Sequence, residues 1–169
     1  MDLTDHALMQ KKRISFELSV FESMEDLPHE AHLLMKTAVS ARLNAYAPYS
    51  KFLVGAAVLL DNGEVIIGSN QENACYPSGL CAERVAVFQA GAKYPGSTIK
   101  SVAISATSMN YVVDKPVAPC GNCRQSIAEY EVKQKAPITI FMMGETGEVF
   151  KCDAISDMLP LVFDSSFLG

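Results

Sequence analysis

The residues Cys120-Gly121-Asn122-Cys123 form a C-x-x-C motif directly after Pro119. Proline is favoured at the first position of a helix, so both thiols are predicted to lie in the first turn, on one face. There they can share one metal ion, and the helix dipole favours their thiolate forms. By itself the motif is equally compatible with a redox site or with half of a structural zinc site.

Cys81-Ala82-Glu83 adds a third thiol at a second predicted helix start, after the chain-turning residues Ser78 and Gly79. If the two helix starts face each other, three thiolates bind tetrahedral Zn²⁺ and leave one position for water, as in a catalytic site. Glu83 is then the candidate general acid and base, because a carboxylate beside zinc-activated water can pass its proton to a leaving amine. Zinc deaminases of nucleobases combine these features.

The other candidate ligands fit a metal site less well. His29-Glu30-Ala31-His32 is one residue short of the H-E-x-x-H signature and is interpreted as a solvated helix face. Cys152 ends a predicted strand and is interpreted as a core residue. Five cysteines is an odd number, which favours thiol or metal chemistry over a disulfide framework.

Helices and strands are predicted to alternate and so to position these helix starts. Apolar residues recur at helical spacing from Pro28 until Pro48, and Asp61-Asn62-Gly63 separates the two strands of a hairpin. The predicted elements are a helix within 28–48, strands 54–60 and 64–69, a helix 81–91, a strand 102–106, a helix 119–132, strands 138–143 and 148–152, and a short helix 154–159. This order predicts an α/β fold in which a mixed sheet carries helices on both faces.

The N-terminal residues are predicted to form an extension, 1–26, before a catalytic domain, 27–169. Within the extension, residues 14–20 alternate between apolar and polar side chains, which predicts a half-buried edge strand. The total length fits one core of ordinary size.

Composition limits the partners. The chain is 49% hydrophobic and 20% charged, as in globular proteins, and its net charge of -5 argues against binding nucleic acid. No stretch reaches about 18 apolar residues, which argues against a membrane span. The start, residues 1–5, lacks the basic region of a secretory signal, so we expect a cytoplasmic protein.

Four motifs in the right order make the chain resemble the cytidine deaminases, specifically the small homotetrameric kind with three zinc cysteines. The resemblance implies a three-layer α/β/α sandwich with a mixed five-stranded sheet, one zinc per chain held by Cys81, Cys120 and Cys123, and Glu83 as general acid and base. The strand at 14–20 is extra and has no counterpart that we can assign. The motifs are Ala47-Pro48-Tyr49-Ser50-Lys51-Phe52 with Val54-Gly55-Ala56-Ala57, Asn70-Gln71-Glu72-Asn73-Ala74, Cys81-Ala82-Glu83-Arg84, and Pro119-Cys120-Gly121-Asn122-Cys123-Arg124-Gln125.

The resemblance also assigns substrate contacts. It implies that Asn70 donates to the ribose 3′-hydroxyl and Glu72 accepts from it, since a hydroxyl needs both kinds of partner. It implies that Phe52 lies against the pyrimidine and that Ala82 offers its backbone N–H to the base. Phe163 would cover the base of a neighbouring chain in a homotetramer with shared sites. From pattern alone, residues 70–73 are an ordinary polar loop, Phe52 a core residue, and Phe163 an anchor on its own core.

Arg84, which ends the third motif, and Cys75, which follows the second, also need an interpretation. Arg84 is expected to donate to the zinc-bound sulfurs and draw charge off them, rather than lie on a helix surface. Cys75 could close a four-cysteine structural site, but the family pattern places small residues of various kinds there, so we interpret it as a non-ligand.

The implied function is hydrolysis of the amidine C–N bond of cytidine and deoxycytidine, with release of ammonia, in pyrimidine salvage. One alternative is a related deaminase of a nucleoside antibiotic or of a base within nucleic acid. Another is a zinc-stabilised binding module, which would need a fourth protein ligand and would have no use for Glu83. The 70–74 motif favours a free nucleoside.

Overall fold

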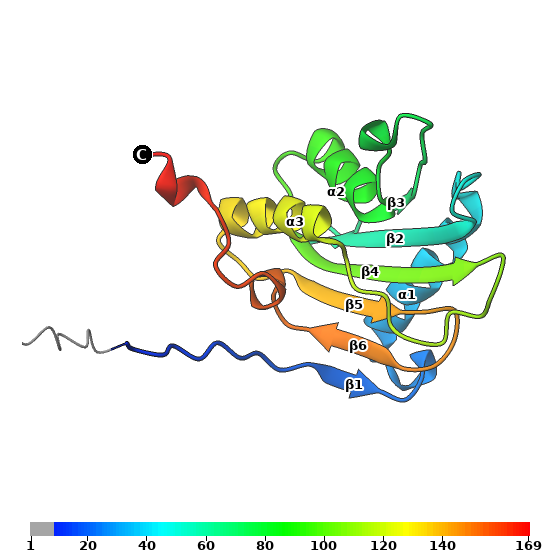
Figure 1. Cartoon of the computed structure of the whole chain (residues 1–169), viewed down its shortest axis with the longest axis horizontal. Coiled ribbons are helices and arrows are strands. Elements are labelled where there is room, and N and C mark those ends of the chain that lie inside the picture. The colour runs from blue at the N-terminus through cyan, green and yellow to red at the C-terminus, as the bar shows by residue number, and fades with distance from the viewer. Residues whose placement is uncertain (1–8) are drawn as a thin grey trace, which may run out of the picture.

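The computed structural model describes residues 9–169. Residues 1–8 lie outside the described residues. They include residues 1–5, on which the expectation of a cytoplasmic protein rests, and the first part of the predicted extension. The strands form one six-stranded sheet with the order β1-β6-β5-β4-β2-β3 (Figure 1). β4 and β5 are parallel and every other neighbouring pair is antiparallel, which confirms the predicted mixed sheet. The strands are β1 Ser19–Phe21, β2 Phe52–Leu60, β3 Val65–Ser69, β4 Ile99–Ser108, β5 Thr139–Met143 and β6 Val149–Cys152.

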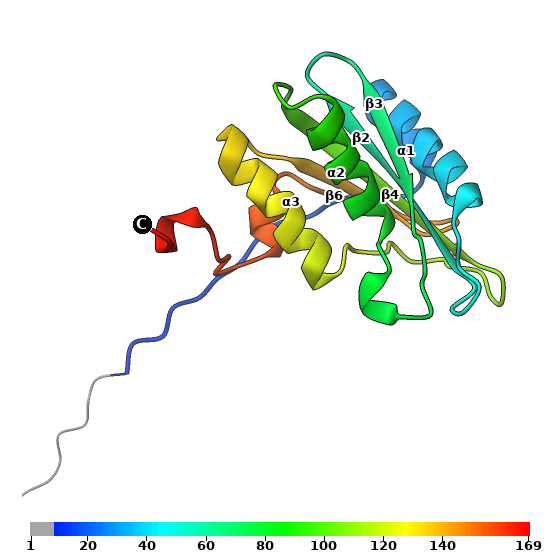
Figure 2. The ribbon, with the colours of Figure 1, turned by 90° about the horizontal axis from the view of Figure 1, so that it is seen from above.

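Three α-helices cover the sheet: α1 His29–Ala41 on one face, and α2 Ala82–Lys93 and α3 Gly121–Gln134 on the other (Figure 2). Both faces of the central strands are therefore buried. In β2, Ala56 and Val58 point into the core beneath α2 and α3, whereas Ala57 and Leu59 point toward α1. This double burial explains why β2 is apolar almost throughout, and it confirms the three-layer α/β/α sandwich. No helix within residues 9–169 is long and apolar enough to cross a membrane.

The predicted hairpin joins β2 to β3. Gly63 takes the left-handed conformation with φ 85°, and Leu60 N donates to Glu64 O at 3.0 Å. Asn62 instead uses its side chain, whose Oδ1 accepts from Glu64 N. Only Gly63 of the Asn-Gly pair thus has positive φ, and Asp61-Asn62-Gly63 form the turn between Leu60 and Glu64, as predicted.

Two helices of the structure differ from their predictions, one in the residue at which it ends and the other in its type. α2 continues past Gly91 to Lys93, because this glycine serves close packing and does not end the helix: a Cβ there would lie 2.4 Å from Tyr130 Oη on α3. The last predicted helix is a 3₁₀ turn, Ile155–Met158.

The N-terminal strand lies at the sheet edge as predicted, but it is shorter and more exposed. Only Ser19–Phe21 pairs, antiparallel to β6, with Ser19 opposite Lys151 and Phe21 opposite Val149. The prediction of a half-buried strand over 14–20 is wrong. β6 ends at Cys152, which lies opposite Leu18 in this register, so residues 14–17 extend past the end of their partner. Ile14, Phe16 and Leu18 are exposed, and Val20 is exposed although it pairs with Phe150.

Candidate active site

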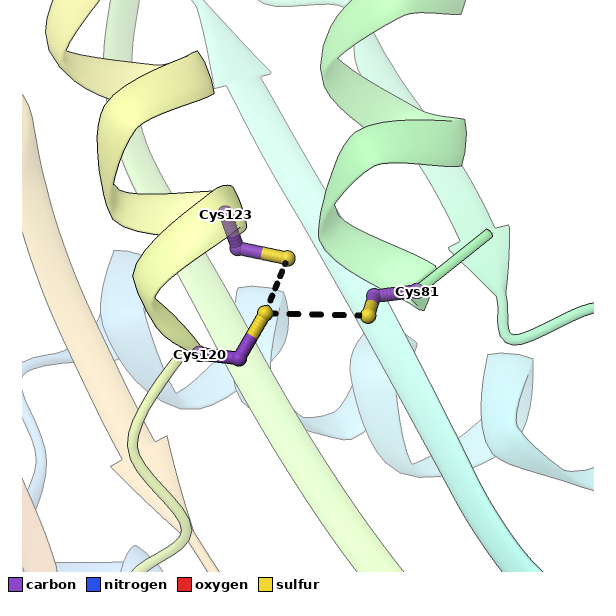
Figure 3. Close-up of side chains that lie close together, drawn as sticks. All are labelled: Cys81, Cys120 and Cys123. Atoms are coloured by element: carbon purple, nitrogen blue, oxygen red, sulfur yellow. Dashed lines mark hydrogen bonds between the residues drawn. The ribbon is translucent and has the colours of Figure 1, made fainter. Parts of the chain in front are cut away.

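The two predicted helix starts face each other on one side of the sheet (Figure 3). Cys81 caps the N-terminus of α2, Cys120 caps that of α3, and Cys123 lies in the first turn of α3. The Sγ atoms of Cys81 and Cys120 are 3.9 Å apart, and those of Cys120 and Cys123 are 3.5 Å apart. All three sulfurs lie within 4.8 Å of one another, so the structure brings together the three thiols that the sequence predicted.

Close packing of α2 on β3 fixes one of these helix starts. A Cβ added to Gly68 of β3 would lie 2.4 Å from Ala82 O and 2.6 Å from Ala86 N. Only a glycine therefore lets the first turn of α2, with Ala82 and Glu83, lie directly on the strand backbone.

The three sulfurs fit one zinc ion. Tetrahedral zinc with bonds of about 2.3 Å holds its sulfur ligands about 3.8 Å apart, close to the distances observed. Among residues 9–169, no fourth His, Cys, Asp or Glu joins this group. Cys75 is exposed and outside it, and Cys152 is buried in the core with its Sγ donating to Ala154 O. The donor set is therefore that of an open site.

The thiols of Cys81 and Cys123 have pKa values shifted in opposite directions. A hydrogen bond from Cys123, with a further contribution from Arg84, lowers the pKa of Cys81 to about 5. The same contact with Cys81, together with burial, raises the pKa of Cys123. Arg84 Nη2 donates to Cys81 Sγ at 3.9 Å, so the guanidinium lies where the sequence predicted, beside a ligand sulfur.

Glu83 is buried, with 4% of its surface exposed, in the first turn of α2 beside Cys81 and Cys123. Burial raises the pKa of Glu83 to about 7, and the negative charge of Cys81 acts in the same direction. A carboxyl group with such a pKa can both accept and release a proton near neutral pH, which is what a general acid and base needs.

A cavity of about 460 Å³ adjoins the thiols. Cys81 and Arg84 line it on one side, and Asn70 and Glu72, which follow β3, line it on another. It is large enough for a small ligand of nucleoside size.

The polar side chains of Asn70 and Glu72 are held by backbone groups. Asn70 Oδ1 accepts from Val54 N at 2.8 Å and its Nδ2 donates to Phe52 O at 2.9 Å, which leaves one N–H of this amide as a donor. Glu72 Oε2 accepts from Tyr49 N at 2.8 Å. Hydrogen bonds from Ser50 and Tyr49 hold the pKa of Glu72 below its ordinary value, so the carboxylate keeps lone pairs for a further donor.

The remaining predicted contacts lie farther from this cavity. Ala82 is the first residue of α2, where backbone N–H groups have no partner within the helix. Phe52, half-buried at the start of β2, and Phe163 are not among the lining residues. Phe163 is 59% exposed and stacks on Phe167 with ring centroids 5.6 Å apart, so its ring is not buried in the core of its own chain.

Two tyrosines at the site were not predicted from the sequence to have a role. Tyr49 and Tyr76 line the cavity with ring centroids 6.0 Å apart. Tyr49 belongs to a recognised motif, whereas Tyr76 lies in a loop with no periodic signal.

Two side chains of α3 connect this helix to the C-terminal segment. Arg124 donates through Nε to Pro119 O at 2.8 Å and through Nη1 to Met158 O at 3.0 Å. Gln125 Nε2 donates to Phe163 O at 2.8 Å. Both residues belong to the C-x-x-C-R-Q motif, but Met158 and Phe163 are distant in sequence, so only the fold reveals these two contacts.

Comparison with known proteins places this site in a family. A model described as the zinc-binding region of cytidine and deoxycytidylate deaminases matches residues 28–137. The chain is 37% identical over 134 residues to a cytidine deaminase of Halalkalibacterium halodurans, an alignment covering 79% of this chain and 94% of the relative. It is 44% identical over 136 residues to a cytidine deaminase of Sporosarcina psychrophila, covering 80% of this chain and 93% of the relative.

Solved structures of cytidine deaminases have a similar fold. A cytidine deaminase from Burkholderia pseudomallei aligns with a TM-score of 0.68 and 36% identity, covering 81% of this chain and all of the other. One from Mycobacterium tuberculosis aligns with a TM-score of 0.62 and 30% identity, covering 80% and 98%. The helix-flanked mixed sheet and the thiol triad at two helix starts thus define a hydrolase of the deaminase class. Within that class, the chain belongs to the cytidine deaminase family.

Proposed function

We propose that this chain hydrolyses cytidine and deoxycytidine to uridine and deoxyuridine, releasing ammonia, as a zinc-dependent enzyme of pyrimidine salvage in the cytoplasm. The observation that carries the proposal is the three-thiol group beside the buried carboxyl of Glu83, next to a cavity lined by Asn70 and Glu72. The family membership supports the same chemistry.

Cys81, Cys120 and Cys123 would hold one zinc ion per chain. When bound, zinc supplies Lewis acidity that makes a water molecule nucleophilic at neutral pH. Arg84 donates to Cys81 Sγ and so offsets part of the negative charge of three thiolates.

Glu83 carries the protons of the reaction. It accepts one proton from the water that attacks C4 of the base and delivers it to the ring nitrogen. It then accepts the proton of the new C4 hydroxyl and delivers it to the amino group, which leaves as ammonia while the C4 oxygen becomes a carbonyl. Its burial excludes bulk water from these transfers, and its raised pKa suits both directions of transfer.

The other residues position the nucleoside. The free N–H of Asn70 donates to the 3′-hydroxyl and Glu72 accepts from it. The Ala82 N–H binds the base and Phe52 flanks it. The exposed ring of Phe163 covers the base in a neighbouring chain, so that each site of the homotetramer is shared between chains.

The charges at the cavity favour a nucleoside over a nucleotide. Glu72, Glu83 and the thiolates oppose a phosphate. Two cations lie near the cavity, but both already interact with other groups. Arg84 donates to Cys81 Sγ, and the positive charge of Lys51 favours the ionised form of Glu72. A free base would leave Asn70 and Glu72 unpaired, at a cost of about 1–3 kcal/mol for each group.

Specificity constants for cytosine, cytidine, deoxycytidine and cytidine monophosphate, measured by ammonia release, test the proposal. We expect both nucleosides to exceed cytosine and the monophosphate clearly. Glu72→Ala should lower the nucleoside constants, whereas Glu148→Ala, an exposed carboxylate distant from the cavity lining, should leave them unchanged. Absence of ammonia release from either nucleoside by zinc-loaded protein would favour a zinc-stabilised binding module or a deaminase of another substrate.

A further inference from the structure

The N-terminal arm, residues 11–21, leaves the molecule at the free edge of the sheet. β1 ends the strand order, so among residues 9–169 only β6 pairs with it, and its outer edge has no partner strand. Residues 9–17 run away from the body in both views, beyond the end of β6 (Figures 1 and 2). The family match begins at residue 28, after the arm.

One face of the arm is apolar and open to solvent. The exposed fractions are 51% for Ile14, 47% for Phe16, 37% for Leu18 and 55% for Val20. Ser15, Glu17 and Ser19 alternate with them. Such alternation beside an unpaired edge is a template for pairing with another strand, and proteins normally block it by charge, proline or a covering element.

The charges along the arm indicate which strand can pair with it. Lys11-Lys12-Arg13 precede the apolar residues, and Glu22, Glu25 and Asp26 follow them. The segment is therefore basic at one end and acidic at the other. When two copies run antiparallel, the basic end of each lies beside the acidic end of the other, and opposite charges across strands attract.

We propose that the arm pairs antiparallel with the arm of a second copy of this chain, joining the two sheets edge to edge across a twofold axis. Registers that keep Ile14, Phe16 and Leu18 on one shared face bury the apolar side chains together. A twofold interface is self-complementary, as this charge pattern requires. A polyanion or an anionic lipid surface would attract the basic end but repel the acidic end, so it fits only half of the arm.

Charge reversal in the full chain, followed by mixing, tests the pairing. One variant carries Lys11→Glu and Lys12→Glu, which makes both charged groups net acidic although Arg13 remains. The other carries Glu22→Lys and Glu25→Lys, which makes both groups net basic although Asp26 remains. Amide hydrogen exchange of residues 14–18 is measured together with sedimentation, because arm protection reports this interface independently of any other contact between chains. We expect protection in the original chain, loss of it in each variant alone at low salt, and recovery when the two variants are mixed.

A matched pair of substitutions tests the apolar face. Phe16→Asp places a carboxylate on that face and should weaken the arm-dependent association by about tenfold or more, because a charge cannot be buried there without a partner. Ser15→Asp adds the same charge on the opposite face and should have a much smaller effect. Circular dichroism checks that both variants fold.

Three results would overturn the proposal. They are unprotected arm amides in the original chain at any concentration, failure of the mixed variants to recover protection, and protection that requires vesicles of phosphatidylglycerol and phosphatidylcholine or added nucleic acid. None of these results concerns deamination, so the arm proposal and the proposed function fail separately.

Discussion

The carboxyl group of Glu83 lies in an environment that an ordinary surface glutamate lacks. It is buried in the first turn of a helix, beside the thiols of Cys81 and Cys123, and burial raises its pKa to about 7. Its backbone neighbours are fixed by the packing of α2 on β3, so a change of its side chain alone should leave the surrounding structure in place.

We predict that Glu83→Gln lowers turnover of cytidine by about 10²- to 10⁴-fold, since an amide cannot carry the proton. Zinc content and the unfolding midpoint should stay near those of the original chain. Glu129→Gln, an exposed position on α3, serves as the control and should keep full turnover. A well-folded Glu83→Gln protein within a few-fold of the original would exclude the proton-transfer role.

The three thiols should act as one metal site. We predict about one zinc per chain by elemental analysis, and loss of most of it in Cys120→Ala together with the activity, because two thiolates and an open position hold zinc weakly. Cys75→Ala, an exposed thiol outside the group, should retain both metal and activity. Zinc near zero in an active preparation would contradict this prediction.

At the scale of elements, the site depends on how closely two helices approach one face of the sheet. Each helix start carries at least one ligand cysteine, and their separation follows from the packing of α2 and α3 on the strands. Gly68 allows this approach for α2, since its missing side chain admits the backbone of Ala82 and Ala86.

We predict that Gly68→Ala lowers the free energy of unfolding by about 1–3 kcal/mol. The two atoms nearest the added Cβ, Ala82 O and Ala86 N, belong to the backbone and cannot rotate away. The substitution should also weaken zinc binding by displacing the start of α2. Gly96→Ala is the matched control, since a Cβ there meets nothing within 4 Å, and it should change stability by less than about 0.5 kcal/mol. Urea denaturation measures both, and equal midpoints would disprove the packing argument.

At the scale of the whole molecule, two aromatic rings of the C-terminal segment are exposed, and the proposed function has one of them complete the site of another chain. Phe163 and Phe167 stack on each other in solvent, and Gln125 of α3 donates to the Phe163 carbonyl. The segment is therefore tied to α3 at its backbone while its ring remains available.

We predict that co-assembly of a Glu83→Gln chain with a Phe163→Ala chain restores activity above that of either variant alone. A site whose Glu83 comes from the second chain and whose Phe163 comes from the first has both side chains intact. The measurement is cytidine deamination after the chains are mixed, dissociated and reassembled. Activity of the mixture equal to the sum of the separate variants, or an active monomer by sedimentation, would show that each chain uses its own Phe163.

The sequence by itself determined the three-layer fold and the three thiols that the fold brings together. It also predicted a carboxyl group, that of Glu83, beside them, and the role of this group as general acid and base stays a prediction. These features follow from local rules: cysteines at helix starts were recognisable from Pro119 and from the turn at Ser78 and Gly79, and strands buried on both faces are mostly apolar. Family motifs added Asn70 and Glu72, which pattern alone assigns to a polar loop.

Only the tertiary structure decided the distances between the sulfurs, the cavity between loops that are far apart in sequence, and the contacts of Arg124 and Gln125 with the C-terminal segment. It also corrected the N-terminal strand. Alternation of apolar residues predicts a strand but not its partner, and β6 ends too early to pair with residues 14–17. Whether an apolar face is buried depends on which other element reaches it, and that information lies in packing between distant segments rather than in local sequence.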